Sequence, residues 1–565
     1  MPQLVDNITH YCLKFAVLAL LLLPISLINN SYAETAATTQ PGATSPTNVN
    51  KIKQSRTSLK KKKANRKVKP TADALQKEIQ ANDNNEPEIL NLTVKPKSAK
   101  KSSSTHNSSL VEDASIDSTQ NSCTLNDYPD NSCIKTYGKL CDEDLEIAKI
   151  AWKYFENNYQ PKTGLVNAAN KYPSTTMWDS GSALAATIAA RDFDFITQKQ
   201  FDDRIMALLT TLNTMKLFNG EAPNKAYNST NAEMVDYGNK ASAEGIGASA
   251  LDLARMVQWL NVLSCKHPKH QTLAQKAVAR WKYCRLIKDG QMYGLAKKPG
   301  KETQVLQEGR LGYEQYAGKI FSRLGFDQKV SKTYKNEFAS QVEIDGVPIA
   351  HDIRDAKTLG AHNYVVTESF IMDGMENGID AENAPLIDNI YKVQQKRWER
   401  TGQITAVTED NVDRDPWFIY NTIFVDGKPW AAITDTGKDM SKFRSVSTKA
   451  AISMALLKPN EFYSKVLMNH VRSAYDPEAG WYSGVYENGF GYNKSITANT
   501  NGVILESLLY KIHGPLAAGC AKCNKGFDLN DQFLTDSNAT NSCIPSRSST
   551  PDCTRLGTCS AVTKE

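Results

Sequence analysis

The 565-residue sequence lacks the short motifs that mark several large enzyme classes. It contains no G-x-S-x-G nucleophile elbow, no H-E-x-x-H zinc motif, no Walker phosphate loop and no G-x-G-x-x-G dinucleotide fingerprint. Its eight histidines are scattered, and His351 and His362 lack the spacing of metal ligands. These absences disfavour serine hydrolases, zinc peptidases and nucleotide-dependent enzymes, and we expect neither a metal nor a cofactor.

A long apolar run is also missing. Residues 15–28 (FAVLALLLLPISLI) have the length of a signal-peptide h-region and are short for a membrane-spanning helix. The small residues SYA at 31–33 resemble a cleavage site, although Asp6 offsets Lys14 in the n-region, so an uncleaved anchor is the alternative. We predict a signal peptide over residues 1–33 and a periplasmic or extracellular location.

Residues 34–120 have almost no aromatic side chains and are rich in Ser, Thr, Asn, Lys and Pro. Such a segment cannot bury enough apolar surface to fold, which predicts a disordered linker. Residues 51–101 hold fifteen Lys and Arg against five Asp and Glu, which leaves about −3 for residues 102–565 of a chain whose net charge is +6. The basic tail could touch an acidic glycan or a membrane surface, with a solvated spacer as the alternative. An exported protein seldom meets nucleic acid, so we expect no nucleic-acid partner.

Cysteine pairs with zinc-ribbon spacing are missing too, because Cys520 and Cys523 form a C-x-x-C without a second one. Ten cysteines remain after Cys12 is set aside with the signal peptide, an even number that favours disulfides in an exported chain. We predict a bridge between Cys265 and Cys284 across the intervening helix. Odd numbers of cysteines then remain before Cys265 and after Cys284. We therefore also predict a bridge between the N-terminal cysteines and the Cys-rich tail, residues 517–565.

Helical periodicity is what the sequence has in abundance between residues 142 and 514. Apolar residues recur at three- and four-residue steps over 145–159, 201–215 and 246–260. Residues 178–195 would place small side chains on nearly every face of a helix, as expected of a helix packed on both sides. Alternation of small-residue and amphipathic helices predicts a double ring of helices over residues 121–516, with short strands at 343–353 and in parts of 402–430.

Long loops rich in Gly, Asn and aromatic residues separate the predicted helices, and loops of this length are usually functional. Flat aromatic rings match the apolar faces of sugars, so these loops predict sugar-stacking platforms. The loop aromatics are Trp178, Tyr227, Tyr237, Trp417, Tyr420, Trp430, Trp481, Tyr482, Tyr486 and Tyr492.

One set of segments carries a family resemblance. It comprises GLVN (164–167), WDSGSALAA (178–186), YGN (237–239), SALDLARMVQWL (249–260), EGRLGYEQYAG (308–318), VVTESFIMDGMENG (365–378), DRDPWFIYNTIFVDGKPWAAITDTG (413–437) and ITANTNGVILESLLYKIHGPL (496–516). Together these resemble the bacterial "domain of unknown function 3131" family, which in turn looks like the glucoamylase-type (α/α)6 toroid glycoside hydrolases. The resemblance implies a mainly α-helical (α/α)6 toroid with a groove at one end, and a polysaccharide-processing activity by analogy.

Glycosidic cleavage needs two carboxyl groups, one acting as an acid and one as a base or nucleophile. Glu314 lies between Tyr313 and Tyr316, which could exclude water and raise its pKa, and the alternative is a structural anchor. Glu368 follows an apolar run, and Asp413 belongs to the acidic stretch 409–415 (EDNVDRD), where calcium binding is a weaker alternative. We predict Glu314, Glu368 and Asp413 as catalytic residues.

The predicted substrate-binding residues are Trp178, Asp179, Tyr313, Tyr316, Trp417, Trp481 and Asn499. Helix capping is the alternative role for Asp179, and TANTNG (497–502) also has the composition of a helix cap. Three function classes remain: a glycoside hydrolase, which we favour, a polysaccharide lyase, and a non-catalytic glycan-binding or envelope-assembly factor. The expected partner in each case is a polysaccharide or oligosaccharide.

Overall fold

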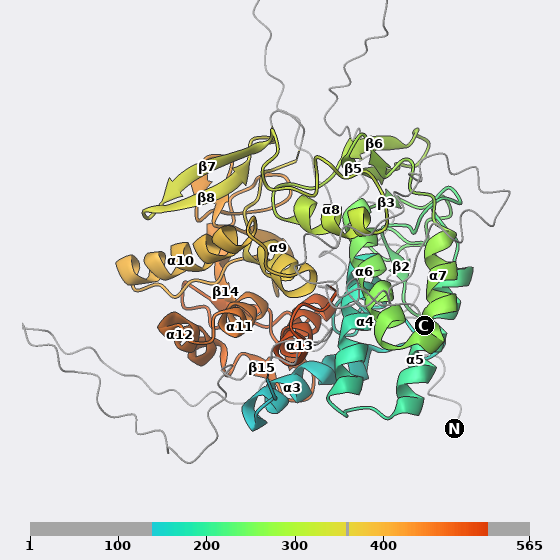
Figure 1. Ribbon diagram of the computed structural model, residues 1–565, viewed down its shortest axis with the longest axis horizontal. Helices are drawn as coiled ribbons and strands as arrows, with labels where there is room; N and C mark the ends of the chain where they lie inside the picture. Colours follow the sequence, from blue (N-terminus) through green and yellow to red (C-terminus); the bar gives the residue numbers. More distant parts are fainter. Residues whose placement is uncertain (1–137, 357–360, 518–565) are drawn as a thin grey trace, which may run out of the picture. The chain divides into compact units, whose positions relative to one another are not determined.

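The computed structural model describes residues 138–356 and 361–517 (Figure 1). The predicted signal peptide, the linker and nearly all of the Cys-rich tail lie outside the described residues. None of the helices in the described part is long and apolar enough to cross a membrane.

Six helices contact one another in a closed cycle, each touching the next and the last touching the first. In chain order they are α4 (Met177–Asp192), α6 (Ala250–Lys266), α8 (Tyr313–Arg323), α9 (Thr367–Met372, continued by a π-helical turn Asp373–Asn377), α11 (Thr448–Leu457) and α13 (Ala498–His513). These inner helices are buried on most sides.

Five further helices pack outside this cycle and precede or follow the inner helices in alternation (Figure 1). They are α3 (Asp142–Asn158), α5 (Gln198–Thr214), α7 (Gln271–Ala279), α10 (Ala384–Thr401) and α12 (Phe462–Val471). The predicted periodic helices over 145–159, 201–215 and 246–260 are therefore confirmed, the third beginning at Ala250 rather than at residue 246.

Small residues let the inner helices approach closely, as the composition of residues 178–195 predicted. A Cβ atom added to Gly181 of α4 would lie 3.0 Å from the Arg255 side chain on α6. A Cβ added to Gly502 of α13 would lie 2.9 Å from the Ser182 Cβ on α4. A larger side chain at either glycine would push α4 away from α6 or α13. The two glycines therefore permit the close packing of these inner helices.

Between α8 and α9, the described residues form a hairpin where the alternation would place a sixth outer helix. Strands β7 (Ala339–Ile344) and β8 (Val347–Asp352) pair antiparallel, and β8 packs on α10 (Figure 1). This hairpin confirms the strands predicted at 343–353 but begins earlier, at Ala339.

The long connections all lead into the first turn of an inner helix and carry short antiparallel strands. The sheets that matter for the site are β9 (Glu409–Asn411) with β10 (Phe418–Asn421) and β13 (Ala432–Ile433), and β14 (Ser445–Ser447) with β17 (Gly484–Tyr486) and β18 (Tyr492–Asn493). A further sheet joins β3 (Gly247–Ala248), β4 (Ile287–Lys288), β5 (Gln291–Ala296) and β6 (Gln304–Gln307), which the helical periodicity did not predict.

The remaining strands form three two-stranded pairs: β1 (Ser174–Thr175) with β2 (Tyr227–Asn228), β11 (Phe424–Val425) with β12 (Lys428–Pro429), and β15 (Tyr475–Asp476) with β16 (Gly480–Trp481). Short 3-10 turns cover Pro268–His270 and Ser441–Phe443.

Candidate active site

The first turns of the inner helices meet at one end of the cycle. The Trp178 ring on α4 lies edge-on to the Tyr313 ring on α8, with centroids 5.5 Å apart. The Trp178 indole Nε1 donates to the Asn499 Oδ1 on α13 over 3.1 Å. All three side chains are partly exposed. Sequence reasoning had assigned these three residues to substrate binding, and the structure brings them together.

Glu368 on α9 joins this group from the other side. The Asn499 amide Nδ2 donates to Glu368 Oε1 over 2.8 Å, and the Lys449 ammonium on α11 forms an ion pair with Glu368 Oε2. The Glu368 side chain is buried, yet each of its oxygens faces a donor. These contacts stabilise the ionised carboxylate, which suits a base or a nucleophile.

Glu409 and Asp410 reach the same place from β9. The Tyr313 hydroxyl donates to Glu409, and Lys449 Nζ lies 3.4 Å from Asp410 Oδ1. Burial, together with the neighbouring Glu368 carboxylate, raises the pKa of Glu409 to about 7. Burial also raises the pKa of Asp410 to about 7 despite the nearby Lys449. Two carboxyl groups with raised pKa values therefore adjoin the Glu368 carboxyl group.

A second group of carboxylates surrounds the start of α6. Glu308 Oε2 accepts from the Ala250 backbone N–H over 2.5 Å, so Glu308 caps the start of this helix. Burial, with Glu308 and Asp179 close by, raises the pKa of Asp252 to about 7. Asp252 was not among the predicted residues. Because it lies in the first turn of a helix, its position in the sequence is also typical of an ordinary capping residue.

Asp179 forms a capping box with Thr176 at the start of α4. The Thr176 hydroxyl accepts from the Asp179 N–H over 3.1 Å, and the Asp179 carboxylate accepts from the Thr176 hydroxyl over 2.8 Å. The capping alternative therefore describes its contacts. Thr497 similarly accepts from the Thr500 N–H at the start of α13, as the composition of residues 497–502 predicted.

Glu314 forms a buried ion pair with Arg354. Its Oε1 accepts from the Arg354 Nη1 over 3.2 Å and from the Gln307 amide over 3.2 Å, and Arg354 also pairs with Asp352. Burial raises the pKa of Glu314, although the hydrogen bonds from Arg354 oppose this. Glu314 is fully buried, so its contacts favour the anchoring alternative over proton donation to a substrate.

Asp413 is also engaged in structural contacts. Tyr486 donates its hydroxyl to Asp413 Oδ1 over 2.7 Å, and the Arg414 Nε donates over 2.7 Å. Burial alone would raise the pKa of Asp413, but these hydrogen bonds outweigh it and hold the pKa below its usual value. Asp413 therefore fastens β17 to the 402–447 loop.

Three predicted stacking residues lie in the core instead. Trp417, Trp481 and Tyr316 have exposed fractions of 1%, 2% and 0%. Trp481 donates its indole N–H to the Ile147 carbonyl over 3.0 Å, and the Tyr316 hydroxyl donates to Glu376 over 2.8 Å. A sugar can stack only on an accessible ring face, so we correct these three assignments to core positions.

An aromatic pair that sequence reasoning had named only in part borders Glu409. The rings of Tyr364 and Tyr420 are stacked, with centroids 3.7 Å apart and an interplanar angle of 8°. Tyr420 pairs with Glu409 across the β9–β10 ladder, and both tyrosines are partly exposed. Aromatic side chains therefore adjoin the carboxyl groups from two directions.

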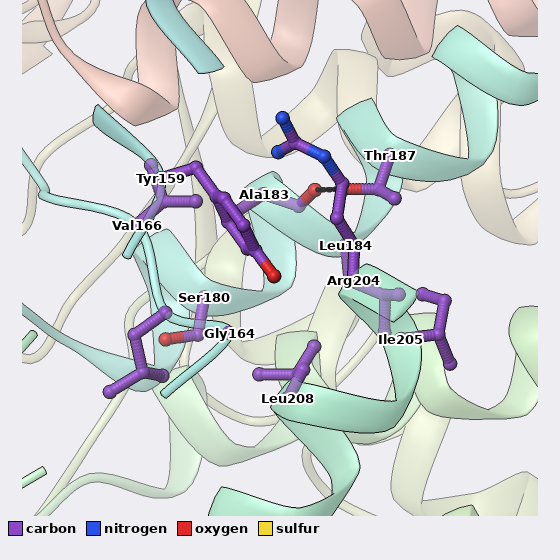
Figure 2. A pocket seen from close by; sticks show the side chains of 11 residues that line it. Tyr159, Gly164, Val166, Ser180, Ala183, Leu184, Thr187, Arg204, Ile205 and Leu208 are labelled. Atoms are coloured by element: carbon purple, nitrogen blue, oxygen red, sulfur yellow. Dashed lines mark hydrogen bonds between the residues drawn. The ribbon is translucent and has the colours of Figure 1, made fainter. Parts of the chain in front are cut away.

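A separate cavity lies between α4 and α5. Figure 2 shows Tyr159 and Arg204 beside it, and its lining is largely aliphatic, with Leu184 and Leu208 among the residues. The Arg204 guanidinium lies 4.0 Å from the centroid of the Tyr159 ring. The lining of this cavity includes none of the carboxyl groups above.

The family model described as "Protein of unknown function (DUF3131)" matches residues 146–514. This chain belongs to the DUF3131 family. The family prediction is thereby confirmed. No curated protein matches the DUF3131 chain at a significant level.

Solved structures similar to this DUF3131 protein are glycoside hydrolases by description. One is an endo-β-1,2-glucanase from Chitinophaga pinensis in complex with sophorotriose and glucose. Its TM-score is 0.51 at 13% sequence identity, and the match covers 68% of this chain and 95% of the glucanase chain. A candidate glucoamylase from Bacteroides uniformis has a TM-score of 0.51 at 12% identity, covering 68% and 95% respectively. Another from Bacteroides fragilis has a TM-score of 0.50 at 13% identity, covering 71% and 94%. At these identities the likeness concerns the fold, which is helix-rich and of the glucoamylase-like type.

Proposed function

We propose that this DUF3131 protein is a glycoside hydrolase with an (α/α)6 toroid fold, acting where the first turns of the inner helices meet. The closed cycle of six inner helices and the five alternating outer helices support the toroid, with the β7–β8 hairpin in place of one outer helix. The fold of the neighbouring structures points the same way.

The observation that carries the proposal is the pairing of two carboxyl groups in contrasting environments. Glu409 has a pKa raised to about 7 and is partly exposed, so it can hold a proton and deliver it to a leaving oxygen. Glu368 faces an amide donor and an ammonium group, so it can remain ionised as the base or nucleophile. Trp178 and Tyr313 would lie against the sugar rings between them.

The charge of the site favours an uncharged glycan. The carboxyl groups of Asp179, Asp252, Glu308 and Glu409 are all partly exposed, whereas Lys449 is buried and already paired. A uronate carboxylate would lie against these carboxyl groups and beside a lysine that is already paired, which disfavours the lyase alternative. The Chitinophaga pinensis enzyme is an endo-β-1,2-glucanase, so we propose a β-linked neutral glucan as the substrate class and β-1,2-glucan as the first to test.

The experiment measures reducing ends released by the full chain from β-1,2-, β-1,3- and β-1,4-glucans and from a polyuronate. Glu409→Gln and Glu368→Gln should each lower kcat by at least about 10²-fold, the usual loss when a general acid or base is removed. Glu314→Gln is the matched control, because it makes the same change at a buried glutamate of the inner helix α8. It should lower the melting temperature because it breaks a buried ion pair, while kcat changes by less than about tenfold.

Loss of activity in Glu314→Gln at unchanged stability, with active Glu409→Gln, would instead return the proton donor to Glu314. Glycan binding by the wild-type protein without release of reducing ends would favour the non-catalytic alternative.

Export and disulfide formation are part of the same proposal. The signal-peptide pattern of residues 1–33 supports a periplasmic or extracellular location. Cys265 ends α6 and Cys284 follows α7, which packs on α6, and neither thiol is a free group. The Cys265–Cys284 pairing and the basic tail's contact with an acidic glycan or membrane remain predictions.

A further inference from the structure

A fully buried charge cluster lies beneath the candidate active site. Arg255 of α6 pairs with Glu376 over 2.6 Å and with Glu506 over 2.9 Å, and all three side chains have no exposed surface. One guanidinium thus faces two carboxyl groups from two other helices. Such a cluster is costly to bury, so its retention inside the cycle calls for a role besides packing.

The guanidinium has a donor left after these two ion pairs. Arg255 Nε donates to the Ser182 hydroxyl on α4 over 3.1 Å. A guanidinium can only donate, so the Ser182 oxygen must accept here. The single proton of Ser182 is then directed to Asn499 Oδ1, at 3.3 Å, or to the Trp178 carbonyl, at 3.2 Å.

The orientation of the Asn499 amide follows from these donors. Trp178 Nε1 can only donate and lies 3.1 Å from Asn499 Oδ1, on the same side as Ser182. The amide oxygen therefore points to α4, and its NH2 group points to Glu368 Oε1 at 2.8 Å. The reversed amide would place an NH2 group against the indole N–H and an oxygen against the Glu368 carboxylate, which is unfavourable on both sides.

Arg255 also contacts the site through the indole itself. Its guanidinium carbon lies 5.1 Å from the centroid of the Trp178 ring, within the range of a cation–π contact. Arg255 therefore fixes Trp178 from below while Asn499 fixes its N–H.

We propose that Arg255 and Ser182 are positioning residues, which hold Asn499 and Trp178 in the orientation that presents an amide donor to Glu368. The residues come from α6, α4, α13 and α9, four helices of the closed cycle. Rigid helices hold such a chain of hydrogen bonds more firmly than loops do, so the carboxylate is preorganised before substrate binds. The link to kcat rests on the proposed function, whereas the orientation of Trp178 and Asn499 does not.

The test compares Ser182→Ala with Ser507→Ala in the full chain. Both substitutions remove one buried hydroxyl from an inner helix, and the Ser507 hydroxyl bonds Ser453 and the Val503 carbonyl, outside the chain of contacts to Glu368. Ser182→Ala should lower kcat on the responsive glucan by about tenfold with KM within about twofold. Ser507→Ala should leave both unchanged at a similar melting temperature.

A second measurement does not need catalysis. The indole N–H signal of Trp178, assigned in 15N-tryptophan-labelled protein with Trp178→Phe, should shift and exchange faster in Ser182→Ala than in Ser507→Ala. The triple variant Arg255→Met/Glu376→Gln/Glu506→Gln, which removes the charges and keeps the volume, should show the same change.

An unmoved indole signal in Ser182→Ala overturns the positioning proposal, whether or not the protein cleaves glycans. Equal losses of kcat in Ser182→Ala and Ser507→Ala overturn it as well. A shifted signal in a wild-type protein that cleaves no glycan supports the positioning and overturns the hydrolase.

Discussion

The two ends of the inner-helix cycle are built from similar residues and differ in how their charges are matched. At the end where the inner helices begin, Lys449 forms ion pairs with both Glu368 and Asp410. Glu409 and Asp252 at the same end have raised pKa values. At the end where they finish, Asp192 alone accepts from both Lys266 over 3.0 Å and His513 over 2.8 Å. One lysine pairs with two carboxyl groups at the first place, whereas one carboxyl group binds a lysine and a histidine at the second.

Loop length follows the same division. The connections from inner to outer helices are short, as between α4 and α5, whereas those leading into the inner helices are long and carry the aromatic residues. Short connections at the finishing end favour stability, and long ones at the starting end give room for a site. Mismatched charge located where the loops are long is typical of functional sites.

The largest difference between the two ends is expected when one buried lysine is replaced at each end. Lys449 and Lys511 are both buried in α-helices and ion-paired, Lys511 with Asp144 at 2.6 Å. Lys449→Met and Lys511→Met should each cost about 3 kcal/mol of unfolding free energy, because a buried carboxylate loses its partner. Lys449→Met should also lower kcat by at least about 10²-fold, because Glu368 would then lose the ammonium group that faces its Oε2.

Denaturant unfolding and steady-state kinetics on both variants test this prediction. Lys511→Met should retain its kcat. Equal losses of activity in the two variants would mean that the starting end has no special part in the chemistry.

The two ends should also respond to pH in opposite directions. The pKa of Glu409 is about 7 in the folded protein and has its ordinary value of 4.5 in the unfolded chain, so this group lowers stability as pH rises through that window. Burial alone would raise the pKa of Asp192, but His513 and Lys266 lower it to about 2, so Asp192 stabilises the fold above pH 3.8 and loses this effect as pH falls toward 2.

Calorimetry across pH on two neutral variants checks both signs. Glu409→Gln should melt above the wild type at pH 8 and close to it at pH 4. Asp192→Asn should be less stable by about 2 kcal/mol at pH 6, with the difference shrinking toward pH 2. A constant difference across pH for either variant would contradict the assigned protonation.

Much of the fold could be predicted because it depends on local composition. The small residues around Gly181 permit contact on both sides of α4, and the apolar spacing of α5 gives it one buried face. The replacement of an outer helix by the β7–β8 hairpin was partly visible in the strand-like residues 343–353. Nothing in the sequence pattern indicated that the alternation of helices would be interrupted there.

The site could be predicted less well, because its charges are defined by distant partners. Trp178, Tyr313, Glu368 and Asn499, which the structure brings together, could be singled out because aromatic and polar residues at helix starts are conspicuous. Glu314 has the same local surroundings, yet Arg354, forty positions later, engages it in the interior. Tyr316 lies one turn deeper than Tyr313 and is thereby buried, a difference that a loop-based prediction does not resolve.

The smallest expected effect comes from removing one hydroxyl group at the end where the inner helices begin. Tyr313 donates to Glu409, and this hydrogen bond favours the ionised carboxylate. Tyr313→Phe keeps the ring against Trp178 and removes the donor, so the pKa of Glu409 should rise by about one unit, the equivalent of one hydrogen bond to a charged group. The basic limb of the kcat profile should then move to higher pH by about one unit, while kcat at its optimum changes by only about threefold. Tyr316→Phe, which removes a hydroxyl bonded to Glu376 at the buried cluster, is the control and should leave the basic limb in place. If both variants move the limb equally, or if Tyr313→Phe moves it to lower pH, then Glu409 is not the group whose proton the reaction uses.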